Sequence, residues 1–373
     1  MQNTKIKKPF EFPCGLKIEN RLVLAPMSTD SGTEKGGLSA EDVDFILKRS
    51  EGFGMVILGS HSVSPTGSAF RRGWNIYDPA NGPALAKLVE KLHEKNVKVV
   101  IQIYHAGRLA QPTFIGRKQP IAPSRIPANR TFASYPKAMA ETEIQQMIED
   151  FGAACEMAIK LGFDGVELHG ANTFLLQQFY SAHSNRREDK WGGSRTNRMR
   201  FLIEVITACV QEVEKNAKRP FLLGYRFSPE ELESPGIRMT DTKFLLMELT
   251  KLPLDYVHIS LSHFQKKSQE GLNIIDELNQ VIPPSIPFIG CGNIQTPMDV
   301  KKVSEIVPLL SVGNATLSDP LWAKKILQGN QDIQTSMRIK ERNKLAIPLP
   351  LWESMINAPS VFFKEEIPKE AGK

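Results

Sequence analysis

Short runs of apolar, often β-branched residues alternate along the chain with longer segments in which apolar residues recur every three or four positions. The first pattern is typical of buried strands and the second of amphipathic helices. We expect eight strands, each followed by a helix. The expected strands are Leu22–Ala25, Met55–Gly59, Val97–Ile103, Gly165–His169, Phe221–Phe227, Tyr256–Leu261, Pro287–Gly290 and Leu309–Gly313. The expected helices are Ala40–Glu51, Pro83–Lys95, Glu141–Leu161, Asn197–Glu214, Asp241–Leu252, Leu272–Val281, Pro297–Glu305 and Pro320–Leu327.

Eight alternations of strand and helix predict an α/β fold, a single closed parallel (β/α)₈ or TIM barrel, over residues 1–330. An open, doubly wound sheet has the same alternation, but the GxGxxG fingerprint that opens its first helix is absent. Residues 331–373 are Pro-rich and should form an irregular C-terminal extension that packs on the barrel or on a partner subunit.

Two strand-to-helix connections are much longer than the others: residues 104–140 after the third strand and 170–196 after the fourth. Connections of this kind lie at the C-terminal mouth of a barrel, where such folds carry their chemistry. Polar side chains near this mouth are therefore the candidates for a functional site.

Composition narrows the class of protein. The 373 residues are 41% hydrophobic and 24% charged, enough for a large core. The net charge of +6 comes mostly from scattered Lys and Arg, which favours a solvated surface over a nucleic-acid-binding face.

The expected location is the cytoplasm. No secretory signal is recognisable, and no apolar stretch reaches the roughly 18 residues of a membrane span. The four cysteines contain no CxxC pair, which argues for reduced thiols and against a cysteine-ligated metal. We predict no metal site, no membrane contact and no nucleic-acid partner, and a homo-oligomer is left open.

The predicted strand ends carry hydrogen-bonding groups and one cation. There is no lysine placed for a Schiff base and no pair of carboxylates, which disfavours aldolase and glycosidase chemistry. The glycine turns GCGN (290–293) and GNAT (313–316) could bind a phosphate through backbone N–H groups, or could simply be tight turns. This combination favours a phosphorylated heterocyclic cofactor such as flavin mononucleotide. The strand-end residues are Pro26, Met27, Ser28, Ser60, Gln102, His169, Asn172, Arg226 and Ser260.

Several long motifs resemble the old yellow enzyme family of FMN-dependent NAD(P)H oxidoreductases. They are NRLVLAPMS (20–28), IQIYHAGR (101–108), GFDGVELHGAN (162–172), FYSAHSNRREDKWGGSRTNRMRFL (179–202) and the glycine turns with SDP (318–320). The resemblance covers roughly residues 15–328, in barrel-compatible order.

The resemblance implies roles for individual residues. His169 and Asn172 would donate hydrogen bonds to the oxygen of a bound carbonyl or phenol, and Arg226 would lie near the flavin edge that becomes negative on reduction. NADH or NADPH would supply the hydride. The residues implied to hold FMN are Pro26, Met27, Ser28, Ser60, Gln102, Arg226, Gly292, Asn293, Gly313 and Asn314.

Two positions depart from the family pattern. Phe174 stands where many members have a tyrosine that protonates the substrate, so we expect slower enone reduction unless water, Tyr104 or Tyr180 supplies the proton. Asn314 stands where members commonly have an arginine that binds the FMN phosphate, so we expect weaker FMN binding.

The functional hypothesis is an FMN-dependent NAD(P)H oxidoreductase that reduces a small electrophilic acceptor such as an enone, a quinone, a nitro compound or O₂. One alternative, which Phe174 favours, is a flavin reductase or NADH oxidase with little ene-reductase activity. The other is a non-catalytic flavin-binding barrel, which Phe174 and Asn314 together would favour.

Overall fold

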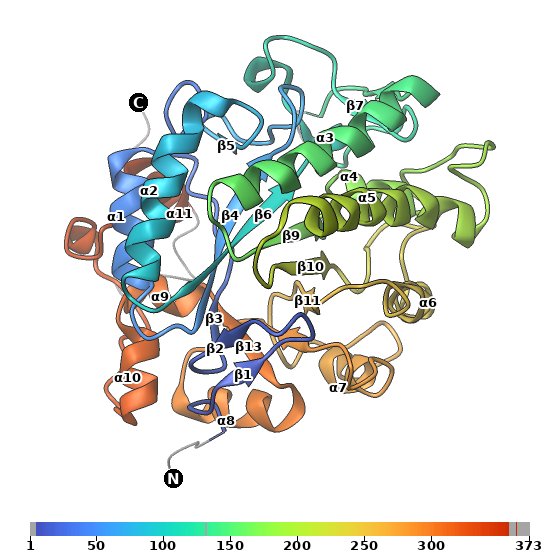
Figure 1. The fold of residues 1–373 in the computed structure, drawn as a ribbon. Helices are drawn as coiled ribbons and strands as arrows, with labels where there is room; N and C mark the ends of the chain where they lie inside the picture. Colours follow the sequence, from blue (N-terminus) through green and yellow to red (C-terminus); the bar gives the residue numbers. More distant parts are fainter. Residues whose placement is uncertain (1–4, 131–132, 358–362, 364–373) are drawn as a thin grey trace, which may run out of the picture.

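The computed structural model describes residues 5–130, 133–357 and 363 and contains a closed barrel of eight parallel strands. The first strand of the barrel pairs with the last strand on one side and with the second on the other. This closure confirms the predicted barrel and excludes the doubly wound sheet. The strands are β3 (Leu22–Leu24), β4 (Met55–Ser62), β6 (Lys98–Tyr104), β9 (Gly165–Gly170), β10 (Leu222–Phe227), β11 (Tyr256–Ile259), β12 (Phe288–Gly290) and β13 (Leu309–Val312) (Figure 1).

Helices surround the barrel, and the two longest, α3 and α5, run side by side on its outside (Figure 1). Each expected helix is present, although its ends often differ from the prediction. The expected Leu272–Val281, for example, is reduced to the six residues of α7. The helices between strands are α1 (Ala40–Arg49), α2 (Gly82–His93), α3 (Glu141–Lys160), α5 (Arg195–Asn216), α6 (Met239–Leu249), α7 (Ile274–Asn279) and α8 (Pro297–Ile306). After β13 come α9 (Asn314–Ser318) and α10 (Trp322–Gln328).

The half of the barrel interior nearest the N-terminal ends of the strands is apolar. Alternate residues of the strands point inward, because side chains of a strand alternate between its two faces. A short hairpin of β1 (Phe10–Glu11) and β2 (Lys17–Ile18) covers the N-terminal end of the barrel and adds its own apolar side chains to this layer. The buried residues of the layer are Phe12, Leu16, Ile18, Val23, Met55, Ile57, Val100, Leu222, Tyr256, Ile289 and Leu309.

The two long connections meet over the opposite end. The first contains two short 3₁₀ turns and the paired two-residue strands β7 (Ile121–Ala122) and β8 (Lys137–Ala138). The second contains the short helix α4 (Leu175–Tyr180). A separate apolar cluster joins them and includes Tyr104, Leu109 and Phe174. A further two-residue strand, β5 (Trp74–Asn75), pairs in parallel with the end of β4.

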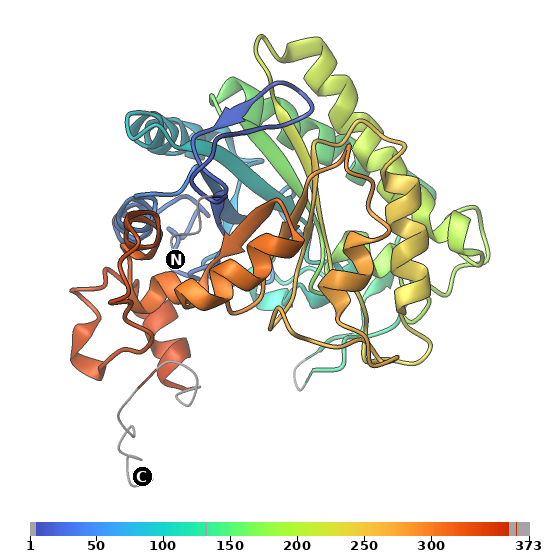
Figure 2. The same ribbon diagram turned by 90° about the horizontal axis from the view of Figure 1, so that it is seen from below.

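The described part of the C-terminal extension contacts α1. Arg49 is fully buried and donates hydrogen bonds to the carbonyl oxygens of Leu345, at 2.7 Å, and Ala346, at 3.5 Å. Its guanidinium also lies over the ring of Phe45, 3.8 Å from the ring centroid. The extension was expected to be irregular, but it contains one short helix, α11 (Leu349–Ile356), which lies next to α1 (Figure 2). Residues 358–362 and 364–373 of the predicted extension lie outside the described residues.

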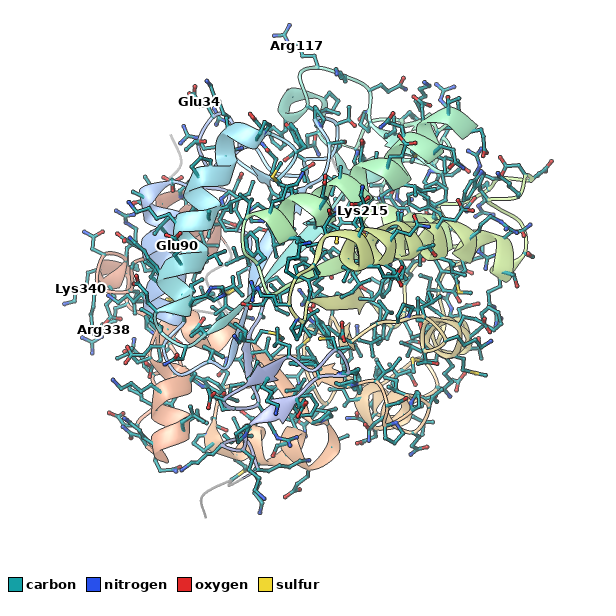
Figure 3. The ribbon with its side chains drawn as sticks, viewed as in Figure 1. Glu34, Glu90, Arg117, Lys215, Arg338 and Lys340 are labelled. Carbon is teal, nitrogen blue, oxygen red and sulfur yellow. The ribbon has the colours of Figure 1, made fainter. Side chains whose placement is uncertain are left out.

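Charged side chains are spread around the surface. Figure 3 labels exposed acidic and basic residues that project from different elements, including Glu90 on α2, Lys215 on α5 and Lys340 in the extension. None of the helices in the described part of the chain combines the length and the apolar character that crossing a membrane requires.

Candidate functional site

A buried polar network replaces the apolar layer toward the mouth of the barrel. Gln102 Nε2 donates to Glu167 Oε1 at 2.7 Å, and His258 Nδ1 lies 2.8 Å from Glu167 Oε2. Burial alone would raise the pKa of Glu167, but attraction to His258 and Arg226 outweighs it and lowers that pKa. Burial likewise opposes protonation of His258, yet Glu167 raises the pKa of the imidazole above its usual value. Glu167 and His258 thus each favour the charged form of the other, and Glu167 is also bonded to the predicted cofactor residue Gln102.

His169 and Arg226 lie above this network as register neighbours on β9 and β10. Burial first, then the positive charges of Arg226 and His258, lowers the pKa of His169 well below its usual range. Its ring is therefore neutral near pH 7. Ala171 N donates to His169 Nδ1 at 3.4 Å, which leaves the ring proton on Nε2 and makes that atom a donor.

Asn172 lies directly beyond the end of β9, in an exposed position. Its backbone N–H donates to Ser228 Oγ at 2.9 Å, and its side-chain oxygen accepts a hydrogen bond from Ser260 Oγ at 3.0 Å. Because the oxygen is already occupied, the Nδ2 group of Asn172 is the end of the amide that can serve a ligand. His169 and Asn172 together offer two neutral donors at the mouth.

The first two strands bring their predicted residues together. Ser28 Oγ and Ser60 Oγ are 3.0 Å apart. Gly59 lets the chain pass close to the carbonyl group of Met27, because any Cβ at residue 59 would overlap that oxygen. Met27 also lies against the last strand, since a Cβ on Gly313 would be 3.3 Å from its sulfur. Pro26, Met27 and Ser28 are all partly exposed at the mouth.

The two glycine turns adopt different conformations. Gly292 has φ +120°, and a side chain there would collide with the backbone of His263 and Phe264. Asn293 follows in the left-handed region, with φ 49°, and its side-chain oxygen accepts from Gln295 Nε2 at 2.8 Å. In the second turn, Asn314 is exposed and begins α9. Gly292 is thus required by a close approach of the backbone, while Asn314 leaves the start of α9 exposed, where a phosphate could bind to backbone N–H groups.

Phe174 forms part of the wall beside the donor pair. Its ring makes edge contacts with His169 and with Tyr104, each at 4.8 Å between ring centroids. Tyr180 does not face this site: its hydroxyl donates to the carbonyl oxygen of Asp241 at 2.5 Å. Tyr104 is fully buried, and burial raises the pKa of its hydroxyl to about 12. Of the two expected substitutes for the missing tyrosine, only Tyr104 lies beside the donor pair.

Sequence reasoning missed the groups that support the site. Glu167 and His258 occupy the same inward-facing register as His169 and Ser260, two residues earlier on their strands, so the period-two rule could have identified them. Ser260 was predicted at a strand end, but no role was predicted for it. Its hydroxyl orients Asn172 by donating to the side-chain oxygen of that residue. Ser228 lies in a loop, where no periodicity indicates a direction.

The residues at the mouth suit a flavin nucleotide. Arg226 is buried, and its Nε has no hydrogen-bond partner in the part of the chain that the structure describes. A buried guanidinium N–H without a partner is costly, so a ligand with an acceptor atom or negative charge would stabilise it. The bond from Gln102 to Glu167 uses Nε2, so the side-chain oxygen of Gln102 can accept a hydrogen bond from a ligand. The glycine turns could add backbone N–H groups. Arg226 would hold the flavin ring and the turns its phosphate.

Comparison with known proteins places the chain in a family. Residues 5–332 match the model of the NADH:flavin oxidoreductase / NADH oxidase family. An NADH:acrylate oxidoreductase of Vibrio harveyi is 41% identical over 92% of this chain, which spans 35% of that protein's length. A probable NADH-dependent flavin oxidoreductase of Bacillus subtilis is 36% identical, with 94% of this chain and 95% of that protein covered.

The fold also matches solved structures. An old yellow enzyme homologue from Zymomonas mobilis superposes with a TM-score of 0.77 and 19% identity, covering 89% of this chain and 95% of that one. The resemblance read from HAGR, HGAN and the SNRREDKWGGS string is thus confirmed. The chain belongs to the NADH:flavin oxidoreductase / NADH oxidase family, whose cofactor is FMN.

Proposed function

We propose that this chain takes hydride from NADH and delivers it, by way of FMN, to a small α,β-unsaturated carbonyl or carboxyl compound. The pair of neutral donors at His169 and Asn172, beside the buried cation Arg226, is the observation that carries this proposal. The names of two relatives, which specify NADH as donor and in one case acrylate as acceptor, support the choice of substrates.

The donor pair would act on the acceptor oxygen. His169 Nε2 and Asn172 Nδ2 would donate to it, and these hydrogen bonds strengthen as negative charge builds up on that oxygen during reduction. A neutral histidine suits this task, because it can donate without giving up its proton to the substrate. When bound, FMN supplies the hydride-carrying chemistry, and Arg226 stabilises the negative charge that reduction leaves on it.

Phe174 favours a second candidate function. A phenylalanine has no proton to give, and a positioned general acid contributes about 10²–10⁴-fold to such a reaction. Oxidation of NADH by the flavin needs no such acid. A flavin reductase or NADH oxidase, with O₂ or a quinone as acceptor, is therefore the alternative.

One set of measurements separates these functions. The FMN-loaded protein is mixed anaerobically with NADH, and the loss of flavin absorbance gives the rate of the first half-reaction. The reduced protein is then mixed with acrylate, 2-cyclohexenone or O₂, and flavin reoxidation is followed. We expect an unsaturated acceptor to reoxidise the flavin faster than O₂ does, with water or Tyr104 supplying the proton that accompanies the hydride.

Two variants test the role of the donor pair. His169→Ala and Asn172→Ala should each slow reoxidation by the unsaturated acceptor about tenfold or more and change reoxidation by O₂ much less. Fast reoxidation by O₂ alone would establish the oxidase alternative. A flavin spectrum that NADH fails to bleach would contradict both functions and leave a binding protein.

A further inference from the structure

The turn that carries Asn172 has an uncommon backbone. Asn172 and Thr173 both have positive φ, at 56° and 63°, and Phe174 N donates to Ala171 O at 3.2 Å across the turn. Two consecutive left-handed residues are the pattern of a type I′ turn, whose second central residue is most often glycine. Threonine is branched at Cβ, and this conformation is strained for it. Something must therefore hold the turn in place.

Gln178 on α4 supplies one half of that restraint. Its Nε2 donates to the carbonyl oxygen of Thr173 at 2.6 Å and to that of Ala106 at 2.9 Å. Its side-chain oxygen accepts from Arg108 N at 3.0 Å. Gly107 has φ +59° and lies so close that a Cβ there would overlap the Gln178 amide. The buried amide of Gln178 thus joins the HAGR turn (residues 105–108) to the turn that carries Asn172, which we call the donor turn.

Gln177 supplies the other half. Its side-chain oxygen accepts from Thr173 N at 2.9 Å, and its Nε2 donates to Glu231 Oε1 at 2.7 Å. Glu231 is itself fixed, because its second oxygen accepts from Ser181 Oγ at 2.5 Å and from Ile237 N at 3.1 Å. Both glutamines are at least 98% buried, so water does not compete for these bonds.

Both backbone polar groups of Thr173 are therefore held by neighbouring side chains of one helix. We propose that Gln177 and Gln178 are positioning residues for Asn172: they keep the strained turn in its left-handed form, so that the Asn172 amide stays aimed at the acceptor oxygen. This inference rests on the proposed donor role of Asn172. The two glutamines, which we call the glutamine brace, are needed because Thr173 is strained in this turn.

The test measures ligand binding and stability in parallel. The ligand is p-hydroxybenzaldehyde, titrated into protein saturated with FMN and followed by the change in the flavin absorbance spectrum. The variants are Asn172→Ala, Gln178→Ala, Thr173→Gly and the double variant with both Gln178→Ala and Thr173→Gly. The free energy of unfolding of each is measured in urea.

Asn185→Ala is the matched control. Asn185 is a buried amide that also bridges two backbone carbonyls, those of Phe179 and Trp191, each at 2.7 Å, but it makes no bond to the donor turn. We expect it to lose stability as Gln178→Ala does and to leave the dissociation constant of the phenol within about twofold of wild type.

Gln178→Ala should weaken phenol binding about tenfold. This is the cost of losing the one hydrogen bond that a misplaced Asn172 would no longer donate to the phenol. In the Thr173→Gly background the same change should cost less than about threefold, because glycine adopts the turn without strain. Equal losses in both backgrounds, or a loss no larger than that of Asn185→Ala, would overturn the brace. Normal binding by Asn172→Ala would instead refute the donor role on which the brace depends.

Discussion

At the scale of single residues, we expect Phe174 to influence which acceptor the protein reduces well. The ring is buried against His169 and Tyr104, so it shapes the donor site while contributing no proton. Phe174→Tyr should raise the rate of 2-cyclohexenone reduction by about 10²-fold, the lower end of general-acid effects. Stopped-flow reoxidation of the reduced flavin measures this rate. The rate of flavin reduction by NADH serves as the internal control and should not change.

A second residue-scale prediction concerns Asn314, the exposed first residue of α9. Asn314→Arg should tighten FMN binding about tenfold, because a charge-assisted hydrogen bond to phosphate is worth more than a neutral one. Quenching of FMN fluorescence by flavin-free protein gives the dissociation constant. Asn330→Arg adds the same charge at another exposed position. If both variants tighten binding equally, a general charge effect explains the gain and the phosphate contact is wrong.

At the scale of elements, Arg49 couples α1 to the C-terminal extension. The buried guanidinium has two hydrogen bonds to extension carbonyls and one, at 3.1 Å, to Phe45 O within its own helix. Burial lowers the pKa of Arg49 to about 9. Arg49→Met should keep most of the apolar contact but lose these bonds, at a cost of roughly 2 kcal/mol in the free energy of unfolding.

Limited proteolysis supplies the second readout for this variant. Cleavage within residues 338–357 should become faster, while cleavage in α5 should not. Lys48→Met is the neighbouring control, since its ammonium group makes a bond to Lys344 O that is exposed to water. Unchanged proteolysis in Arg49→Met would mean that other contacts hold the extension.

The elements also show what could be predicted from the sequence. The eight barrel strands were found because each is a run of buried apolar residues, and the strand-end rule then placed His169, Gln102 and Arg226 at the mouth, where the structure has them. The hairpin of β1 and β2, the strand β5 and the helix α9 were missed, because two to five residues carry no readable period. Gln177 lies in an unpredicted short helix, and its partner Glu231 is 54 positions away, so only the folded chain reveals their contact.

At the scale of the whole molecule, three buried histidines set the response to acid. Burial lowers the pKa of His61 to about 4 and that of His105 to about 3, and burial with Arg226 and His258 lowers that of His169 well below 6.5. As pH falls below about 6.5, the unfolded chain binds protons that the folded one does not. Stability therefore falls between about pH 6.5 and 4, by about 1.4 kcal/mol per pH unit for each histidine.

Urea unfolding at pH 7.5, 6.5, 5.5 and 4.5 tests this slope. His105→Asn, whose side-chain oxygen can replace Nδ1 as the acceptor for Gly107 N, should reduce the slope between pH 6.5 and 5.5 by about one third, since carboxylates with lowered pKa values add to the slope only at lower pH. His258 does not add to it: its pKa is raised, so its contribution is fully present in acid and is lost only as pH rises through the folded pKa. An identical slope in His105→Asn would contradict the assignment.

The closure of the barrel by β3 between β13 and β4 has a consequence for how the chain is made. Residues 22–24 emerge early in synthesis, yet one of their two neighbours is not complete until residue 312 has been added. During that interval β3 has an unpaired edge, and unpaired strand edges promote aggregation. The apolar hairpin beneath it has a shorter delay, because Cys14 N is bonded to Asp255 Oδ1 from far along the chain. The first strand of the barrel is thus the last to be enclosed, and slower translation late in the chain should lower the yield of folded protein more than slower translation early on.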